Sequence, residues 1–385
     1  MKKVLVINNK YKIKGGEDSN IIDEINLLKN KYIVEFLEFD NSKKMTLLDF
    51  ISLFTNSNLV SNQILIKKLK SFNPDAVYIH NLWFVGNLGL FKILKKYNCN
   101  TLIKIHNFRY YCAKSFLIRK HLKLKPKCNA CNMSSNASMF FNKYFQDSYI
   151  RSFLLIIYIK RFLNILKSDK LKILTITNFH QHYLVQSGVD QKKLDLYLNP
   201  IEIKKNKKNK NLSESKSVIY AGRLNEEKGI RELLNTWKYV EKNDYILHIY
   251  GTGPLEKELV KKYSSDNIKF YGEVENDFVI EAISKARAVI TSTKMYEGQP
   301  RLLCEASSFG VPSIFPSFGG MTEFFPDDYK FSFKQFDYDD LLNKINLLKN
   351  KEILNQEGMR VQEYLINKID KNNLLNKFDK ILEKN

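Results

Sequence analysis

Glu297 and Glu305 stand eight residues apart in the segment YEGQPRLLCE, across a Gly-Gln-Pro turn and the expected start of a helix. An ionised carboxylate can accept two hydrogen bonds from a vicinal diol, so these residues suit a ligand with neighbouring hydroxyl groups. Paired carboxylates also serve glycoside hydrolases, as acid and nucleophile. Because Leu302 and Leu303 place Glu305 inside a helix with apolar neighbours, a binding role is favoured for it.

Two cations lie about 75 residues upstream, in VIYAGRLNEEKG, which indicates a strand, a tight turn and a helix start. Arg223 falls in the turn and Lys228 at the helix start. Arg presents a planar fork and Lys a compact point charge, so the pair suits a diphosphate whose negative charge grows as a bond to it breaks. Gly222 and Gly229 let the backbone approach closely. Taken alone, the stretch also fits a strand-turn-helix with surface charges.

A third segment, HIYGTGPLEKEL, lies between these two and places Gly251 and Gly253 in a strand-to-helix turn. Further on, Gly319-Gly320 precedes Glu323. In this order the segments resemble the nucleotide-sugar half of a GT-B glycosyltransferase of the family-4, retaining type. The resemblance implies a nucleotide diphosphate sugar as donor, UDP- or GDP-linked, and a last loop at Gly319-Gly320 near the base or phosphate.

The resemblance also implies roles for individual residues. Glu305 would hold the ribose hydroxyls, and Glu297 would bond the transferred sugar or balance the positive charge of its transition state. The N–H groups after Gly298 are expected at a helix N-terminus, with Pro300 in the first turn. Many relatives carry an aromatic or apolar residue where Gln299 stands, which bears on the sugar accepted. The residues assigned to donor binding are Gly15, Gly16, Glu17, Arg223, Lys228, Gly298, Gln299 and Glu305, and those assigned to catalysis are His106, Glu297, Arg223 and Lys228.

In the first half of the chain, Gly15-Gly16 follows the first expected strand and precedes a helix that starts near Asp18. The N–H groups of such a helix start can bind an anion, and in the family resembled a loop of this form lies over the diphosphate. His106 ends a later strand and matches the family histidine that reaches the transferred sugar. Asn107 stands where many relatives carry Asp, so no carboxylate base is expected at that position. His80 ends another strand, where it fits either a loop-capping role or a role in the site.

Cys112, Cys128 and Cys131 form C-x15-C-x2-C inside a basic loop. The last two suit zinc, with His121 as a further ligand, but the full four-ligand spacing is missing and packed or free thiols fit as well. The string HNFRYYC followed by Cys-x2-Cys resembles bacterial polysaccharide glycosyltransferases, which supports the family and not the metal. The chain has five cysteines, an odd number that fits reduced thiols in a cytoplasm. No metal or other cofactor is expected in the site, because the two cations and helix N-termini supply positive charge.

The net charge of +21 is concentrated in residues 1–200, which hold 32 Lys and Arg against 13 Asp and Glu, whereas residues 201–385 hold 30 against 28. The basic half is expected to face an anionic membrane, a lipid pyrophosphate or nucleic acid. The sequence has no helix-turn-helix, zinc-finger or RNP signature, which argues against nucleic acid. Residues 139–167 are rich in aromatic and aliphatic side chains with interspersed Lys and Arg. They fit an interfacial helix on anionic lipid, and equally a buried helix with basic ends.

The apolar run near the N-terminus, Val4–Ile7, is too short for a signal peptide, and the sequence has no run of 18 apolar residues. We therefore expect a cytoplasmic protein, and from its basic first half we expect it to be peripheral on the inner face of the plasma membrane.

Short apolar runs alternate with helical periodicity in both halves, which is typical of a parallel sheet covered by helices. Strands are expected at Val4–Ile7, Val34–Leu37, Ala76–Ile79, Leu102–Ile105, Ile173–Ile176, Leu194–Leu198, Val218–Tyr220, Ile246–Tyr250, Ile268–Tyr271, Ala288–Thr291 and Ser313–Phe315. Helices are expected at Ile21–Lys29, Gln63–Phe72, Leu88–Lys96 and Phe179–Ser187, and through the tail from Asp339 to Lys384. A polar stretch at 204–216 follows Asn199-Pro200 and indicates a solvated linker.

The expected fold class is α/β, with two Rossmann-like doubly wound domains that face a cleft in the GT-B manner and a C-terminal helix that crosses back to the first domain. The expected divisions are an acceptor domain at 1–199, a basic linker at 200–216, a nucleotide-sugar domain at 217–368 and the helix at 369–385.

The resemblance runs from Met1 to about Phe325 and implies retaining transfer of a sugar to a hydroxyl of a lipid-linked glycan, in capsule, O-antigen or exopolysaccharide assembly. It implies that the nucleotide diphosphate leaves from the same face of the sugar that the acceptor hydroxyl attacks. The donor phosphate would help to deprotonate the acceptor. Two alternatives stay open: a glycoside hydrolase or phosphorylase that uses Glu297 as a nucleophile, and a non-catalytic basic binding protein.

Overall fold

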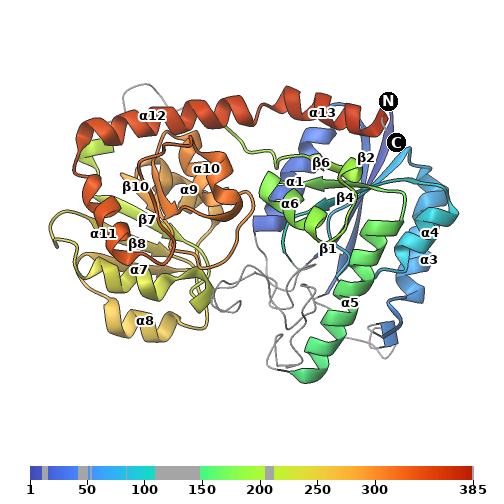
Figure 1. Ribbon diagram of the computed structural model, residues 1–385, viewed down its shortest axis with the longest axis horizontal. Helices are drawn as coiled ribbons and strands as arrows, with labels where there is room; N and C mark the ends of the chain where they lie inside the picture. The colour runs from blue at the N-terminus through green and yellow to red at the C-terminus, as the bar shows by residue number, and fades with distance from the viewer. Residues whose placement is uncertain are drawn as a thin grey trace. The chain divides into compact units, whose positions relative to one another are not determined.

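The computed structural model describes residues 1–10, 16–41, 51–52, 54–83, 85–108, 148–203 and 212–383. These residues fold into two compact units (Figure 1). Unit 1 holds the described residues up to Pro200 together with residues 370–383, and unit 2 holds the described residues from Ile201 to Ile369. The C-terminal segment therefore returns to the unit in which the chain begins.

Unit 1 is built on a six-stranded parallel sheet in the order β2-β1-β3-β4-β5-β6. This is the flavodoxin-like order, with its switch point between β1 and β3. Residues Val4–Ile7 of β1 are fully buried, as expected for a central strand covered on both faces. The strands are β1 (Lys3–Lys10), β2 (Ile33–Asp40), β3 (Ala76–Ile79), β4 (Asn100–Ile105), β5 (Lys172–Thr175) and β6 (Leu194–Leu196). The helices include α1 (Gly16–Leu28), α3 (Leu59–Phe72), α4 (Leu90–Lys96), α5 (Tyr149–Ser168), α6 (Asn178–Gln186) and α13 (Lys371–Glu383).

Unit 2 has its own six-stranded parallel sheet, in the order β12-β11-β10-β7-β8-β9. With β7 counted as the first strand this is the Rossmann order, whose switch point lies between β7 and β10. The strands are β7 (Ser217–Ala221), β8 (Ile246–Tyr250), β9 (Ile268–Gly272), β10 (Ala288–Ile290), β11 (Ser313–Pro316) and β12 (Ser332–Phe333). The helices are α7 (Ile230–Trp237), α8 (Glu256–Tyr263), α9 (Asn276–Ser284), α10 (Arg301–Ser308), α11 (Tyr338–Leu347) and α12 (Lys351–Lys368).

The predicted fold class, α/β with two Rossmann-like domains, is confirmed. Every predicted strand overlaps an observed one, and only β12 was not predicted, because two residues carry no apolar period. The predicted helical tail is divided into α11, α12 and α13.

Part of the predicted linker is folded into unit 2. Leu212 is buried at the start of a 3-10 turn, Leu212–Glu214. The guanidinium of Arg287 donates to the carbonyls of Ser213 and Ser215 at 2.6 and 3.1 Å, which ties these residues to the start of β10. The prediction of a solvated linker was therefore wrong for Leu212, Ser213 and Ser215, whereas Glu214 is exposed, and residues 204–211 lie outside the described part of the chain.

The last helix, α13, packs on unit 1 as predicted. The ring of Phe378 is fully buried, with centroids 5.6 Å from Tyr32, 5.3 Å from Tyr78 and 5.6 Å from Tyr197. Asp379 accepts a hydrogen bond from the hydroxyl of Tyr32. Phe378 thus contacts aromatic side chains from three separate parts of unit 1.

Helix α5, which makes up the described part of the aromatic segment, carries both buried and exposed apolar residues. Leu154 and Leu155 are buried in unit 1, as expected for a core helix, whereas Tyr149, Ile150 and Phe153 in its first turns are exposed. Residues 139–147 of that segment lie outside the described residues. Within the described chain, every helix is too short or too polar to cross a bilayer.

Candidate active site

The switch point of unit 2 carries the donor-binding residues predicted in the second half of the chain, whereas Gly16 and Glu17 lie in unit 1. β7 and β10 are neighbours in the sheet. The carboxyl end of β7 leads to Arg223 and Lys228, and that of β10 leads through the loop of Glu297 into α10, which carries Glu305. In doubly wound sheets, ligands bind outside the carboxyl ends of the strands at this point.

Arg223 lies in the turn after β7, and its side chain is exposed. Its neighbours are anchored to β8 and the residues after it: the N–H of Gly222 donates to the carbonyl of Tyr250 at 3.0 Å, and the N–H of Leu224 donates to that of Thr252 at 2.9 Å. The guanidinium is therefore presented from an anchored turn.

Lys228 ends a 3-10 turn, Glu226–Lys228, and does not lie in the first turn of α7. The side chain of Asn225 caps this turn by accepting from the N–H of Lys228 at 3.1 Å. Gly229 follows at φ 68°, where a Cβ atom would lie 2.0 Å from the carbonyl oxygen of Ser292. A glycine is therefore required for the turn after β7 to pack against the segment after β10.

This packing brings Lys228 and Glu297 together. Nζ lies 2.6 Å from Oε1, and the two side chains are 30% and 26% exposed. The hydroxyl of Thr293 donates to the same oxygen at 3.4 Å. The carbonyl of Glu297 accepts from the N–H of Gly320 at 3.1 Å, which joins the predicted last loop to the site. A predicted cation, a predicted carboxylate and that loop therefore meet within unit 2.

Glu305 is 9% exposed on α10, beside a cation that was not predicted. Arg301 Nε lies 2.7 Å from Glu305 Oε1. The sequence does contain a signal for this pair, because Arg and Glu four residues apart on a helix lie on the same face. Pro300 is the N-cap of α10 and not a first-turn residue, because its ψ of 95° is extended. Gly298 and Gln299 are buried in the loop before the helix.

In unit 1, His80 and His106 follow the neighbouring strands β3 and β4. Nδ1 of His80 lies 2.9 Å from Nε2 of His106, and the rings are stacked with centroids 5.2 Å apart. Burial lowers the pKa of both imidazoles well below 6.5, and the cation of Lys104 adds to the effect. Both rings are therefore neutral near pH 7. The structure thus joins the predicted catalytic histidine to the one whose role was open.

Glu17 lies in the first turn of α1, after Gly16, and the predicted Gly15 is outside the described residues. The amide of Asn107 donates to Glu17 Oε2 at 3.4 Å. The helix start predicted to bind phosphate thus lies beside the end of β4. Although residue 107 is not a carboxylate, Glu17 brings a carboxylate to it.

The residues considered for zinc, Cys112, His121, Cys128 and Cys131, all lie outside the described residues. Cys99 and Cys304 are free thiols. In the part of the chain that the structure describes, no three His, Cys, Asp or Glu side chains gather in a way that could hold a metal ion.

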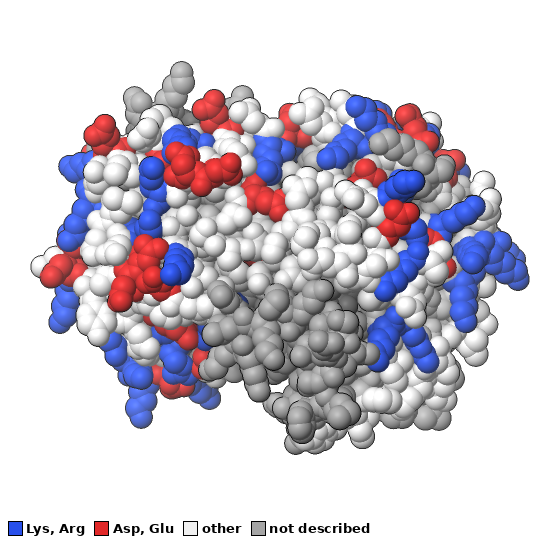
Figure 2. All heavy atoms as spheres, viewed as in Figure 1, with Lys and Arg blue, Asp and Glu red and all other residues white. Residues whose placement is uncertain are grey.

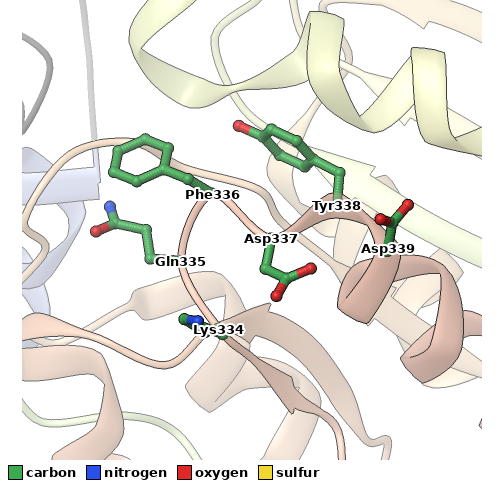
Figure 3. A pocket seen from close by; sticks show the side chains of 6 residues that line it. All are labelled: Lys334, Gln335, Phe336, Asp337, Tyr338 and Asp339. Carbon is green, nitrogen blue, oxygen red and sulfur yellow. The ribbon is translucent and has the colours of Figure 1, made fainter.

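A hollow of about 460 Å³ in unit 2 is lined by Lys334, Gln335, Phe336, Asp337, Tyr338 and Asp339 (Figure 3). Phe336 adopts φ 67°, a left-handed conformation that is rare for a bulky residue. The amide of Gln335 donates to the carbonyl of Lys294 at 3.4 Å, which ties this loop to the segment that carries Glu297. No motif in the sequence pointed to this loop.

Residues 202–367 match the family described as glycosyl transferases group 1. Among curated proteins, the chain is 33% identical over 113 residues to the amylovoran biosynthesis glycosyltransferase AmsD of Erwinia amylovora, a match that covers 29% of this chain and 32% of the relative. It is 28% identical over 151 residues to the lipopolysaccharide 1,6-galactosyltransferase of Escherichia coli (strain K12), covering 37% of this chain and 41% of the relative. The chain thus spans less than half the length of either of these relatives.

Among solved structures, Anabaena Alr3699/HepE in complex with UDP-glucose matches with a TM-score of 0.67 and 13% identity, over 100% of both chains. At this identity the likeness concerns the fold, which is that of GT-B glycosyltransferases. The match to the glycosyl transferases group 1 family thus covers most of unit 2.

Proposed function

We propose that the protein is a retaining, family-4 type glycosyltransferase that moves a sugar from a nucleotide diphosphate to a hydroxyl of a lipid-linked glycan in bacterial surface polysaccharide assembly. The observation that carries this proposal is the meeting of Lys228 and Glu297 at the switch point of a group 1 domain. Arg223 extends from the same turn as Lys228, and Glu305 lies on the helix that follows Glu297. The names of the two curated relatives, in amylovoran biosynthesis and galactosyl transfer, support the same class.

The proposed donor carries UDP, since the HepE structure holds UDP-glucose on the same fold. Arg223 and Lys228 bind the diphosphate, and Glu305, held by Arg301, accepts hydrogen bonds from the ribose hydroxyls. In this proposal no metal is required, because these two cations and the N-terminus of α10 neutralise the phosphates.

In the proposed reaction, the bond between the sugar C1 and the β-phosphate oxygen breaks, and its electron pair stays with the phosphate. The acceptor oxygen bonds to C1 on the same face, and its proton passes to a phosphate oxygen. Lys228 and Arg223 stabilise the negative charge that grows on the diphosphate, and Glu297 balances the positive charge on the sugar ring. His106 bonds a hydroxyl of the transferred sugar.

A thermal-shift experiment with UDP, GDP and ADP tests the donor site. We expect UDP to raise the Tm of the wild type and to have no effect on Arg223→Ala or Glu305→Ala. Glu281→Ala is the matched control, because Glu281 also forms an i,i+4 ion pair on a helix, with Lys285, but is exposed. A wild type that no nucleotide stabilises would contradict the proposal.

The stereochemistry is tested by proton NMR of the product formed from a UDP-sugar, whose anomeric coupling must match that of the donor. The acceptor probe is a short lipid-linked oligosaccharide. A sugar covalently attached to Glu297, detected by mass spectrometry, together with release of free sugar, would favour the hydrolase alternative.

We further propose that unit 1 contacts the cytoplasmic face of the plasma membrane through the first turns of α5. Tyr149, Ile150 and Phe153 are 52%, 67% and 53% exposed there. Figure 2 shows Lys and Arg side chains gathered over α3 and α4 and beside α5 on the same unit. Apolar side chains flanked by cations suit a surface of anionic lipid.

Co-sedimentation with vesicles tests this contact. We expect binding to vesicles that contain phosphatidylglycerol, weaker binding to phosphatidylcholine alone, and loss of binding in Ile150→Glu. Met359→Glu, an equally exposed apolar position on α12 of unit 2, is the control. Equal binding of both variants would place the contact elsewhere.

A further inference from the structure

His80 has no part in the reaction proposed above, yet its ring is only 5% exposed and touches His106. Its Nδ1 faces Nε2 of His106 at 2.9 Å. The second nitrogen of each ring, Nε2 of His80 and Nδ1 of His106, is buried and meets no hydrogen-bond partner among the described residues. The two rings are therefore joined by one contact, and the outer nitrogen of each ring is buried without a partner among the described residues.

The ring of His80 is held in place by a buried polar chain. Tyr78, two residues earlier, packs against it with ring centroids 4.5 Å apart. The Tyr78 hydroxyl donates to Glu24 Oε1 at 2.6 Å, and Lys104 Nζ donates to Glu24 Oε2 at 2.8 Å. Because these three side chains are fully buried, His80 is the fixed member of the pair, whereas His106 is partly exposed.

The short contact between two neutral rings requires one hydrogen between them. Either His80 Nδ1 donates to His106 Nε2, or His106 Nε2 donates to His80 Nδ1. In the first arrangement Nδ1 of His106 carries a hydrogen and is a donor. In the second it is bare and is an acceptor. The hydrogen that His80 shares therefore decides whether the outer nitrogen of His106 is a donor or an acceptor.

His80 also lines a cavity of about 30 Å³ together with Asn81, Trp83 and Asn107. A volume of this size holds one water molecule. A water molecule there would lie beside His80 and the side chains of Asn81 and Asn107. The cavity accepts either arrangement, so the tautomer of His106 is set at its contact with His80.

We propose that His80 is a positioning residue for His106: it shares one hydrogen with Nε2 of His106 and so fixes the orientation and tautomer of that ring. The partly exposed ring of His106 then meets a hydroxyl of the transferred sugar in one defined orientation. The contact of His106 with the sugar rests on the proposed function, whereas the control of its tautomer by His80 does not.

NMR of protein labelled with ¹⁵N-histidine tests the control of the tautomer directly. Two-bond ¹H–¹⁵N correlations report which ring nitrogen carries the hydrogen. We expect one tautomer of His106 in the wild type, both tautomers in His80→Phe, and one again in His80→Asn, whose amide takes the place of Nδ1. His182→Phe, which removes an exposed histidine on α6, is the control and should leave His106 unchanged. An unchanged single tautomer in His80→Phe would overturn the proposal.

Kinetics test the consequence for transfer. We expect kcat of His80→Phe to fall about 100-fold, with the KM of the donor within about twofold of the wild type, and His80→Asn to recover most of the rate. His80→Leu replaces His80→Phe if that variant does not fold. A rise in KM with unchanged kcat, or an Asn variant as slow as Phe, would contradict a positioning role. If the wild type transfers no sugar, the proposed function fails, and the NMR result alone decides the role of His80.

Discussion

Lys228 Nζ and Glu297 Oε1 lie 2.6 Å apart, although 69 residues separate them in the chain. Each is proposed to touch the donor, the cation at the diphosphate and the carboxylate at the sugar. In the proposed complex a diphosphate competes with Glu297 for Lys228, because the cation is already paired. The proposal therefore couples binding of the nucleotide to the ion pair of Glu297.

We expect Glu297→Gln to bind UDP about two- to fivefold more tightly, because Lys228 loses its competing carboxylate and a partly exposed ion pair is worth up to about 1 kcal/mol. Transfer should fall about 100-fold, since the charge that balances the sugar ring is lost. Calorimetry of UDP binding and a transfer assay measure the two effects. Lys349→Met breaks the Lys349–Asp244 pair of the same unit and should alter neither. Weaker UDP binding in Glu297→Gln would show that no competition exists.

Gly229→Ala should destabilise unit 2 more than Gly272→Ala. Both glycines have φ near 69°, which costs another residue about 1–2 kcal/mol. At Gly272 the nearest atom to an added Cβ is 3.9 Å away, whereas at Gly229 it is the Ser292 carbonyl oxygen at 2.0 Å. Overpacking therefore adds about 1–3 kcal/mol at Gly229 alone. Urea unfolding of the two variants measures the difference, and equal losses would refute the clash.

Lys104→Met should lower the free energy of unfolding by about 3–5 kcal/mol, because it leaves the fully buried Glu24 carboxylate without its cation. The double variant Lys104→Met with Glu24→Leu should recover part of this loss, since no buried charge remains. Lys31→Met removes the partly exposed pair with Asp379 and should cost less than about 1 kcal/mol. A double variant no more stable than Lys104→Met would mean that the hydrogen bond of Tyr78 to Glu24 dominates.

The free energy of unfolding should fall as the pH drops below about 6.5. Burial lowers the pKa of His180 to about 3 and lowers the pKa of His80 and His106 well below 6.5. Below pH 6.5 the unfolded chain therefore binds protons that the folded protein does not, at about 1.4 kcal/mol per pH unit for each histidine. His180→Phe should remove one such contribution between pH 5.5 and 4. Denaturant unfolding across that range measures the slope, and an unchanged slope in His180→Phe would refute the assignment.

Much of the fold followed from local pattern. Apolar runs such as Val4–Ile7 and Ile246–Tyr250 predicted central strands, because a strand covered on both faces needs no polar alternation. The two-residue strand β12 carries no such pattern and was missed. The apolar residues of α5 lie on more than one face, so only packing showed which of them are buried and which are exposed.

The sequence by itself determined the residue types of the site and their order: cations after β7, carboxylates around the start of α10, and histidines after β3 and β4. Local periodicity and motif spacing act over a few residues, so they place these groups on elements. Tertiary structure alone decided the partners, Lys228 with Glu297 and His80 with His106. Such contacts depend on which strands are neighbours and on close packing at Gly229, and neither property is encoded within one segment.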